Sequence, residues 1–189
     1  MNTRLLGRLC IIGSLIAVAD GIRLVLTGHQ DVPGFRHLDT IQFLTQLAWA
    51  VGALCAVLGL IALKATGTNP IFRFLSYVPV VGYIASIIGL LLGLTGVPTA
   101  NNPIGIVGQI LAMGGMLVLA ILVLAAKRWH GWRKLTPLLT ILTIPLGAML
   151  VGITGLDGWF IIINAAATAL LGYAILSSIS VAQLRTAAA

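Results

Sequence analysis

The sequence predicts an all-α, polytopic integral membrane protein, a bundle of six transmembrane helices. Of its 189 residues, 59% are hydrophobic and only 8% are charged, whereas about 25% of the residues in an ordinary globular domain are charged. Six apolar runs are each long enough to cross the ~30 Å hydrocarbon core of a bilayer, which takes ~20 helical residues. We place these runs at 9–27, 41–63, 75–95, 104–126, 135–154 and 159–181.

The apolar runs do not alternate between apolar and polar residues, as the ~10-residue strands of a membrane β-barrel would. The segments that connect the runs are short, and none of them could bury a hydrophobic core of its own. We therefore expect a single transmembrane domain over residues 1–189, with no soluble module attached.

The first run raises the question of whether it is retained. Its basic start, its apolar stretch and the sequence Ala17-Val18-Ala19 are typical of a secretory signal that is cleaved after Ala19. However, the apolar run resumes beyond Asp20 and completes a full membrane crossing. We expect the segment to be retained, and cleavage after Ala19 is the alternative.

The charges are distributed unevenly along the chain, whose formal net charge is +7. One side of the predicted bundle receives Arg4, Arg8, Lys64, Arg73, Lys127, Arg128, Arg133, Lys134 and Arg185, and no acid. The other side receives Asp31, Asp39, Asp157 and Arg36. Because cytoplasmic loops are enriched in Lys and Arg, this asymmetry predicts cytoplasmic N- and C-termini in a bacterial-type plasma membrane. We expect the bases to contact anionic lipid headgroups, each contributing about 1 kcal/mol, rather than nucleic acid.

The chain contains an internal repetition. The second and fourth runs align without a gap at an offset of 63 residues, so that Gln46 matches Gln109 and Lys64 matches Lys127. The odd runs share a basic start and an end in Leu-Thr-Gly or Ile-Thr-Gly. The pattern suggests three parallel, pseudo-repeated helical hairpins, formed by runs one and two, three and four, and five and six.

Small residues recur at helical spacing in three of the runs. Lipid tails are as apolar as leucine, so membrane helices associate through close packing and polar contacts. We therefore predict seams that face the bundle. Their small residues are Gly52, Ala56 and Gly59; Gly82, Ser86, Gly89, Gly93 and Gly96; and Gly105, Gly108, Ala112 and Gly115. Pro79 and Pro145 should interrupt the third and fifth runs.

An acid and a base lie inside the first run, at Asp20 and Arg23. Residues at i and i+3 are neighbours on a helix, and the Arg23 side chain leans back toward Asp20. Burying either charge alone costs about 2.5–3.5 kcal/mol on insertion scales, so we expect an ion pair. We favour a structural pair near the outer interface that extends to Gln42 or Thr45; the alternative is a site that handles a ligand or a proton.

Three amide side chains fall inside the runs at related depths, Gln46, Gln109 and Asn164. We favour hydrogen bonds between helices, which contribute about 0.6 kcal/mol each in membranes. The alternative is that the three amides line a polar path through the bundle.

The loop sequence KRWHGWRK interleaves aromatic and basic residues. We interpret it as a candidate headgroup or partner contact made by Lys127, Arg128, Trp129, Trp132, Arg133 and Lys134. Trp129, Trp132 and Trp159 lie where runs meet loops, as expected for an interfacial aromatic belt.

The sequence offers no grouping of residues suited to catalysis or metal binding. Cys10 and Cys55 lie far apart within runs and are expected to be buried thiols. The histidines His29, His37 and His130 lie in or beside loops, with His130 on the opposite side from the other two, which argues against a haem. We expect no metal site and no cofactor, and a single intramembrane acid cannot support paired-carboxylate chemistry.

These observations together favour a non-enzymatic protein, either an accessory subunit of a larger membrane assembly or a lipid-binding bundle. The expected partners are membrane lipids, a membrane protein or a second copy of the chain. The alternative is a small transporter or channel, with a path near Asp20, Arg23 and the intramembrane amides.

Overall fold

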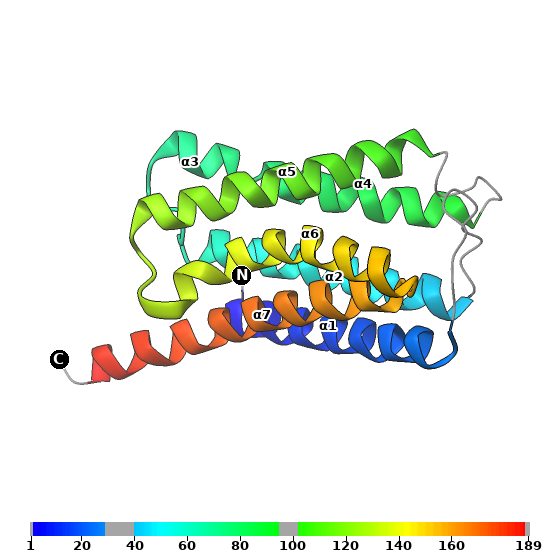
Figure 1. Cartoon of the computed structure of the whole chain (residues 1–189). Helices are drawn as coiled ribbons and strands as arrows, with labels where there is room; N and C mark the ends of the chain where they lie inside the picture. The colour runs from blue at the N-terminus through cyan, green and yellow to red at the C-terminus, as the bar shows by residue number, and fades with distance from the viewer. Residues whose placement is uncertain (1, 29–39, 95–101, 188–189) are drawn as a thin grey trace.

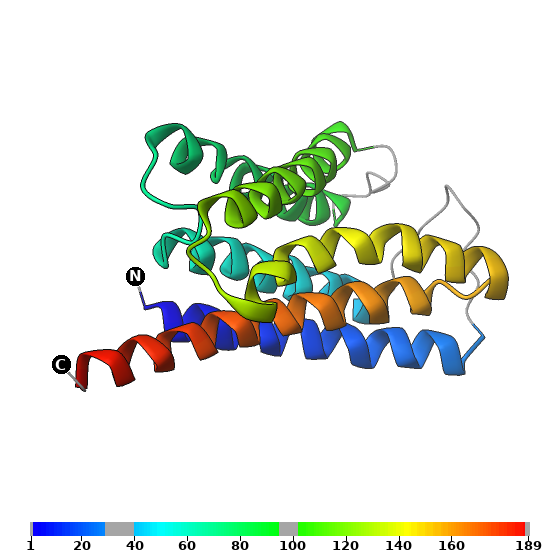
Figure 2. The ribbon, with the colours of Figure 1, turned by 60° about the vertical axis from the view of Figure 1, so that its left-hand side comes forward.

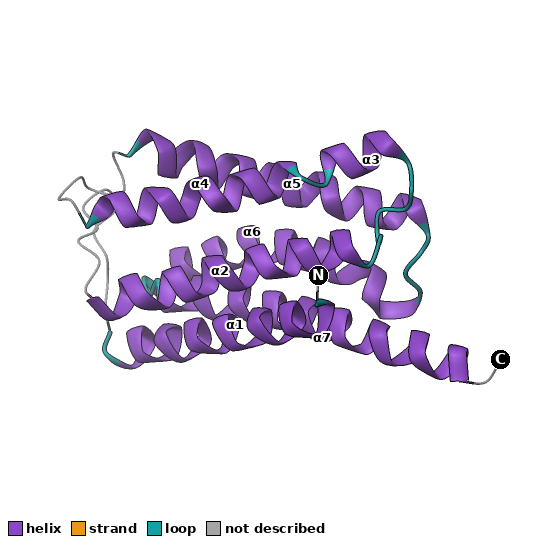
Figure 3. Ribbon diagram, turned by 180° about the vertical axis from the view of Figure 1, so that it is seen from behind, coloured by secondary structure: helices purple, strands orange, loops and turns teal. Residues whose placement is uncertain are grey.

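The computed structural model describes residues 2–28, 40–94 and 102–187, with side chains described as far as residue 179 in the last segment. All regular structure in these ranges is helical (Figure 3). The elements are α1 (Thr3–Leu26), α2 (Thr40–Ala62), α3 (Pro70–Leu75), α4 (Val78–Gly93), α5 (Pro103–Ala126), the 3₁₀ helix η2 (Gly131–Leu135), α6 (Thr136–Thr154) and α7 (Gly158–Ala187). The predictions for His29, Asp31, Arg36, His37, Asp39 and Gly96, and for the side chain of Arg185, lie outside the described residues.

Six helical segments of the described chain are long and apolar enough to cross a membrane, which confirms the predicted six-helix bundle. The third and fifth spans are composite, α3 with α4 and η2 with α6, and both begin before the predicted starts at 75 and 135. The early start of the third span has a local cause. The Asn69 side chain caps α3 by accepting a 2.9 Å hydrogen bond from the Ile71 amide, and Pro70 occupies the first turn.

The third span is broken rather than merely kinked near Pro79. Ser76 and Tyr77 separate α3 from α4, and Pro79 lies in the first turn of α4, where its missing N–H leaves no helical bond unmade. The Ser76 hydroxyl lies 2.7 Å from the carbonyl of Phe72 and 3.1 Å from the Thr66 hydroxyl, which fixes the break. Pro145, in contrast, lies inside a continuous α6.

The six spans form a closed ring in chain order, in which α7 returns to pack against α1 (Figures 1 and 2). Helices adjacent in the chain pack as the predicted hairpins, α1 with α2, α4 with α5, and α6 with α7. One end of the ring holds both termini, the α2–α3 connection and the α5–η2 connection; we call it the basic end (Figure 1). The turn between α6 and α7 lies at the opposite end, which we call the distal end.

The repeat between the second and fourth spans extends to the backbone. Helix α2 begins at Thr40 and α5 begins 63 residues later at Pro103. Lys64 and Lys127 follow these helices and both adopt the left-handed conformation, with φ of 51°. A residue in this conformation stops a helix by turning the chain away from its axis. Helix α7 continues beyond the bundle instead (Figure 2).

Glycine seams bring α4 and α5 together backbone to backbone, as predicted. A Cβ atom at Gly82 would overlap the backbone of Ala112, and one at Gly108 would lie 2.5 Å from the amide nitrogen of Ser86. Gly89 approaches Gly105 in the same way. The side chain of Asn102 adds a 3.0 Å hydrogen bond from its Nδ2 to the carbonyl of Gly89.

Two further seams attach α1 to its neighbours. A Cβ atom at Gly13 would overlap the carbonyl of Ala48 on α2. Gly21 of α1 faces Gly158 of α7 so closely that a Cβ atom on Gly158 would overlap the carbonyl of Gly21. The ring is therefore closed by contacts as tight as those within its hairpins.

The main hydrophobic core fills the half of the bundle near the basic end. It comprises Cys10, Ala56, Val57, Leu60, Ala65, Met116, Leu119, Val123, Trp129, Leu171, Ala174 and Ile175. These residues come from α1, α2, α5, α7 and two connections at the basic end. Trp129 corrects the prediction of an interfacial belt residue, because its side chain is only 7% exposed and belongs to this core.

Candidate functional site

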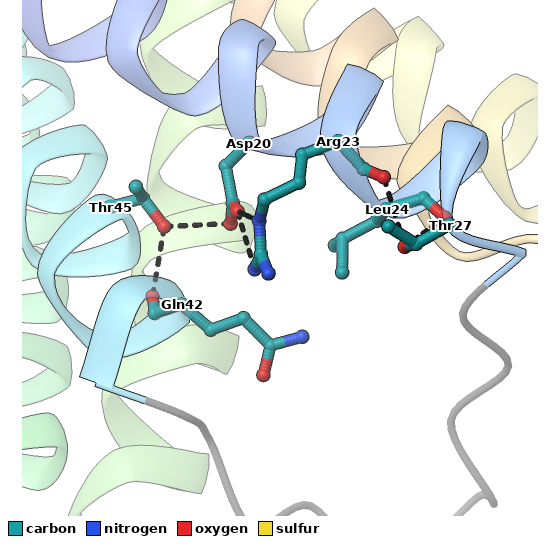
Figure 4. A network of polar contacts seen from close by, with 6 residues as sticks. All are labelled: Asp20, Arg23, Leu24, Thr27, Gln42 and Thr45. Atoms are coloured by element: carbon teal, nitrogen blue, oxygen red, sulfur yellow. Dashed lines mark hydrogen bonds and ion pairs between the residues drawn. The ribbon is translucent and has the colours of Figure 1, made fainter.

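The predicted pair of Asp20 and Arg23 is the centre of a polar cluster between α1 and α2 (Figure 4). The Nε and Nη2 atoms of Arg23 each lie 2.8 Å from Oδ1 of Asp20. The Thr45 hydroxyl donates a 2.8 Å hydrogen bond to Oδ2 of the same carboxylate. The hydroxyl oxygen of Thr45 also lies 3.0 Å from the carbonyl of Gln42.

This cluster neutralises the acid within the bundle. The Asp20 side chain is 2% exposed, whereas that of Arg23 is 35% exposed. Both carboxylate oxygens accept hydrogen bonds, so the buried charge is paired and solvated by protein groups, which is the condition for tolerating it there. Gln42 is buried beside the cluster, in the first turn of α2.

Asn164 makes the hydrogen bond between helices that its position suggested. The Thr143 hydroxyl of α6 lies 3.2 Å from Oδ1 of Asn164, and Nδ2 of Asn164 donates a 2.8 Å hydrogen bond to the carbonyl of Phe160. Gly147 makes room for this contact, since a Cβ atom there would lie 3.3 Å from Nδ2 of Asn164.

The structure does not bring the three predicted amides together by direct hydrogen bonds. Gln46 is half-buried, Gln109 is exposed and Asn164 is buried. No hydrogen bond joins any two of them within the described part of the chain. Among the described residues, the expected bond between helices is therefore present for Asn164 but not for Gln109.

The predicted basic and aromatic loop is attached to the bundle by its two tryptophans. Trp129 is buried in the hydrophobic core, and Trp132 packs against α7. The ring of Trp132 stacks on that of Tyr173 in α7, with centroids 5.9 Å apart and planes inclined by 15°. The Thr136 hydroxyl donates a 2.8 Å hydrogen bond to the carbonyl of Arg133. Lys127, Arg128 and Lys134 are exposed in this segment, and Arg133 is half-buried.

Two polar groups that sequence reasoning did not single out as sites are buried without a hydrogen-bond partner among the described residues. They are the Ser14 hydroxyl and the Nε1 atom of Trp49. Trp49 could have been found from its spacing, since it shares a helix face with Gln42 and Thr45.

The two cysteines are free and buried, as predicted. The Cys10 thiol lies 3.2 Å from the carbonyl of Thr168, which accounts for its orientation toward α7. The described residues contain no group of three or more metal-ligating side chains.

The fold and its polar cluster define the class: a multi-pass membrane protein built as a closed ring of six helices. Comparison with protein-family models, with curated proteins and with solved structures finds no match for this chain.

Proposed function

We propose that this protein is a non-enzymatic helical bundle that binds anionic lipid at its basic end. The observation that carries the proposal is the charge of that end. It presents Arg4, Arg8, Lys64, Arg73, Lys127, Arg128, Arg133 and Lys134, and no acidic residue among the described ones. Of these bases only Arg133 is half-buried; the others are exposed.

The chemistry of the basic end matches a layer of lipid phosphates. Lys and Arg near an anionic leaflet each contribute about 1 kcal/mol of attraction, and that attraction is screened by salt. The stacked Trp132 and Tyr173 are 44% and 56% exposed. Aromatic rings of this kind are enriched at the level of the headgroups, so they support the bases as interfacial anchors. The proposal places this end, with both termini, in the cytoplasm of a plasma membrane.

Lipid binding is tested by purifying the protein in a mild detergent and measuring retained lipid by native mass spectrometry. We expect bound anionic phospholipid on the wild type and at least about tenfold weaker retention when Lys127, Arg128, Arg133 and Lys134 are changed to Gln. A matched control, Lys127→Arg with Lys134→Arg, keeps the charge and should retain the lipid.

Two results would contradict lipid binding. One is a lipid-free monomer that shows no preference for anionic over zwitterionic nanodiscs. The other is equal lipid retention by the wild type and the four-Gln variant. Recovery of a stoichiometric membrane-protein partner, without bound lipid, would favour an accessory subunit instead.

A small transporter or channel is the second candidate, and the observation that favours it is the burial of Asp20 inside a span. In this conformation the apolar core occupies the basic half of the bundle. If the protein is a transporter or channel, the flux of its solute or ion into reconstituted vesicles should depend on Asp20, and Asp20→Asn should abolish that flux. Unchanged flux in Asp20→Asn would remove the acid from any transport mechanism.

A further inference from the structure

Two pairs of basic residues lie in the connection between α5 and α6, at the basic end of the bundle (Figure 1). Lys127 and Arg128 directly follow α5, whereas Arg133 and Lys134 belong to η2, just before α6. Three of the four side chains are exposed, and Arg133 is half-buried. Helix α5 packs against α6, and the axes of packed helices are about 8–10 Å apart. The two pairs therefore lie about one helix spacing from each other, at the same end of neighbouring helices.

The charge of this connection exceeds what one lipid phosphate can balance. The basic end has no acid among its described residues, so no described carboxylate competes for these four bases. A phosphodiester carries one negative charge and can occupy only one of the two pairs. A lipid with two phosphates, joined through a short bridge such as glycerol, brings one phosphate to each pair. The second contact is then made within an already bound ligand, which raises the affinity without any new kind of contact.

The stacked side chains of Trp132 and Tyr173 lie on the outside of the helix ring, next to the second pair of bases. Tyr173 is 56% exposed, whereas Leu171 and Ala174 beside it are fully buried in the core. Because Arg133 and Lys134 directly follow Trp132, the stack keeps them close to α7. The indole N–H and the phenol O–H are suited to hydrogen bonds with phosphate and ester oxygens at the membrane interface.

An exposed apolar face continues from this stack into the membrane-spanning part of α6. Of the six spans, the one formed by η2 and α6 is the least buried. Its exposed leucines recur at spacings of four, three and four residues, on one helix face: Leu135, Leu139, Leu142 and Leu146. Residues at i and i+3 of a 3₁₀ helix share a side, so Trp132 stands at the head of this face. Acyl chains that lie along it therefore reach a headgroup layer that contains the bases.

We propose that the connection between α5 and α6 binds one anionic lipid with two phosphate groups. One phosphate contacts Lys127 and Arg128, the other contacts Arg133 and Lys134, and the acyl chains lie on the exposed face of α6. This site, which we call the η2 site, rests on the proposed lipid binding at the basic end. It gives that binding a location, a stoichiometry of one lipid per chain and a headgroup class.

The headgroup class is tested by native mass spectrometry of the protein in a mild detergent. One titration uses a lipid in which two phosphatidyl groups share a glycerol, and the other uses phosphatidylglycerol at equal total phosphate. We expect one two-phosphate lipid per chain, with an apparent affinity at least about tenfold higher than that of phosphatidylglycerol. Equal affinities would overturn the two-phosphate class and leave lipid binding at the basic end intact. Absence of binding by either lipid would overturn both proposals.

The location is tested with the variant Arg133→Gln/Lys134→Gln and the charge-matched control Lys64→Gln/Arg73→Gln. The control removes two exposed bases from the same end of the bundle but outside the η2 site. Loss of the second pair should remove the preference for the two-phosphate lipid, a fall in its affinity of at least about tenfold. The control should change that affinity less than about twofold, since its bases contact neither phosphate.

The first pair provides an independent check, because Lys127→Gln/Arg128→Gln should remove the same preference. Thermal unfolding of each variant without lipid verifies that the fold is kept. A loss that is equal in all three variants would show that the lipid responds to the charge of the whole end, and would overturn the η2 site.

Discussion

The hydroxyl of Thr45 donates a 2.8 Å hydrogen bond to Oδ2 of Asp20 and so joins α2 to α1 inside the apolar bundle (Figure 4). Arg23 occupies the other carboxylate oxygen from within α1. The acid and the base in the first span thus have a structural account: each stabilises the other, and a neighbouring helix completes the arrangement.

Asp20→Asn should destabilise the bundle by leaving the half-buried Arg23 cation without its counter-charge. We expect the free energy of unfolding to fall by about 1–3 kcal/mol, below the range for a fully buried pair because Arg23 is partly exposed. Equilibrium unfolding in mixed detergent micelles measures the change. The double variant Asp20→Asn/Arg23→Gln should recover most of the loss, and a double variant less stable than Asp20→Asn alone would refute the pairing argument.

Thr45→Val isolates the contact between helices. It removes the hydroxyl while nearly keeping the shape, and the expected loss is about 0.6–1.7 kcal/mol, the range for such bonds in membranes. Thr154→Val is the matched control, because among the described residues its hydroxyl bonds locally and not to another helix. It donates to the carbonyl of Leu150 in α6 at 2.8 Å and accepts from the amide of Leu156 just after the helix. Similar losses in the two variants would mean that the Thr45 bond does not fasten α2 to α1.

The glycine seam of α4 and α5 predicts a sharp contrast between two Gly→Ala variants. A methyl group at Gly82 would overlap the backbone of Ala112, whereas nothing lies within 4 Å of the corresponding position at Gly114. Gly82→Ala should force the helices apart and cost at least about 1–3 kcal/mol, and Gly114→Ala should leave stability nearly unchanged. Thermal unfolding of both variants in one detergent provides the comparison. A Gly82→Ala protein as stable as Gly114→Ala would contradict the backbone-to-backbone seam.

The native thiols should be unreactive in the folded protein. Cys10 is fully buried and Cys55 is 7% exposed. Maleimide should therefore modify neither residue in the membrane and both after denaturation in SDS, and mass spectrometry of the intact chain reads out the difference. Rapid modification of native protein would show that the core opens.

The sequence predicted the six spans and the glycine seams because both depend on local properties, length, apolarity and helical spacing. The pairing of Asp20 with Arg23 was predictable for the same reason, since i and i+3 neighbours meet on any helix. The partner of Asp20 on the second helix was harder to predict. The sequence left Gln42 and Thr45 as alternatives, and the structure shows Thr45.

Other features depend on packing between distant segments and leave no local signal. Trp129 lies in a loop flanked by bases, which is typical of an interfacial position, yet its side chain is buried in the core. The stacking of Trp132 on Tyr173 joins residues far apart in the chain. The exposure of Gln109 likewise depends on how far α5 is covered in the distal half, which no periodicity along α5 records.

Lipid binding at the basic end requires that the chain cross the membrane six times with its basic turns on one aqueous side. The most direct measurement introduces one cysteine at a time into the protein with its two buried native thiols. The positions are Thr68 and His130, in two basic-end connections, and Thr154, near the distal end. Intact cells are then labelled with an impermeant maleimide. We predict labelling of Thr154→Cys in intact cells, and labelling of Thr68→Cys and His130→Cys only after the membrane is permeabilised. Labelling of Thr68→Cys and His130→Cys from opposite sides of the membrane would contradict the account.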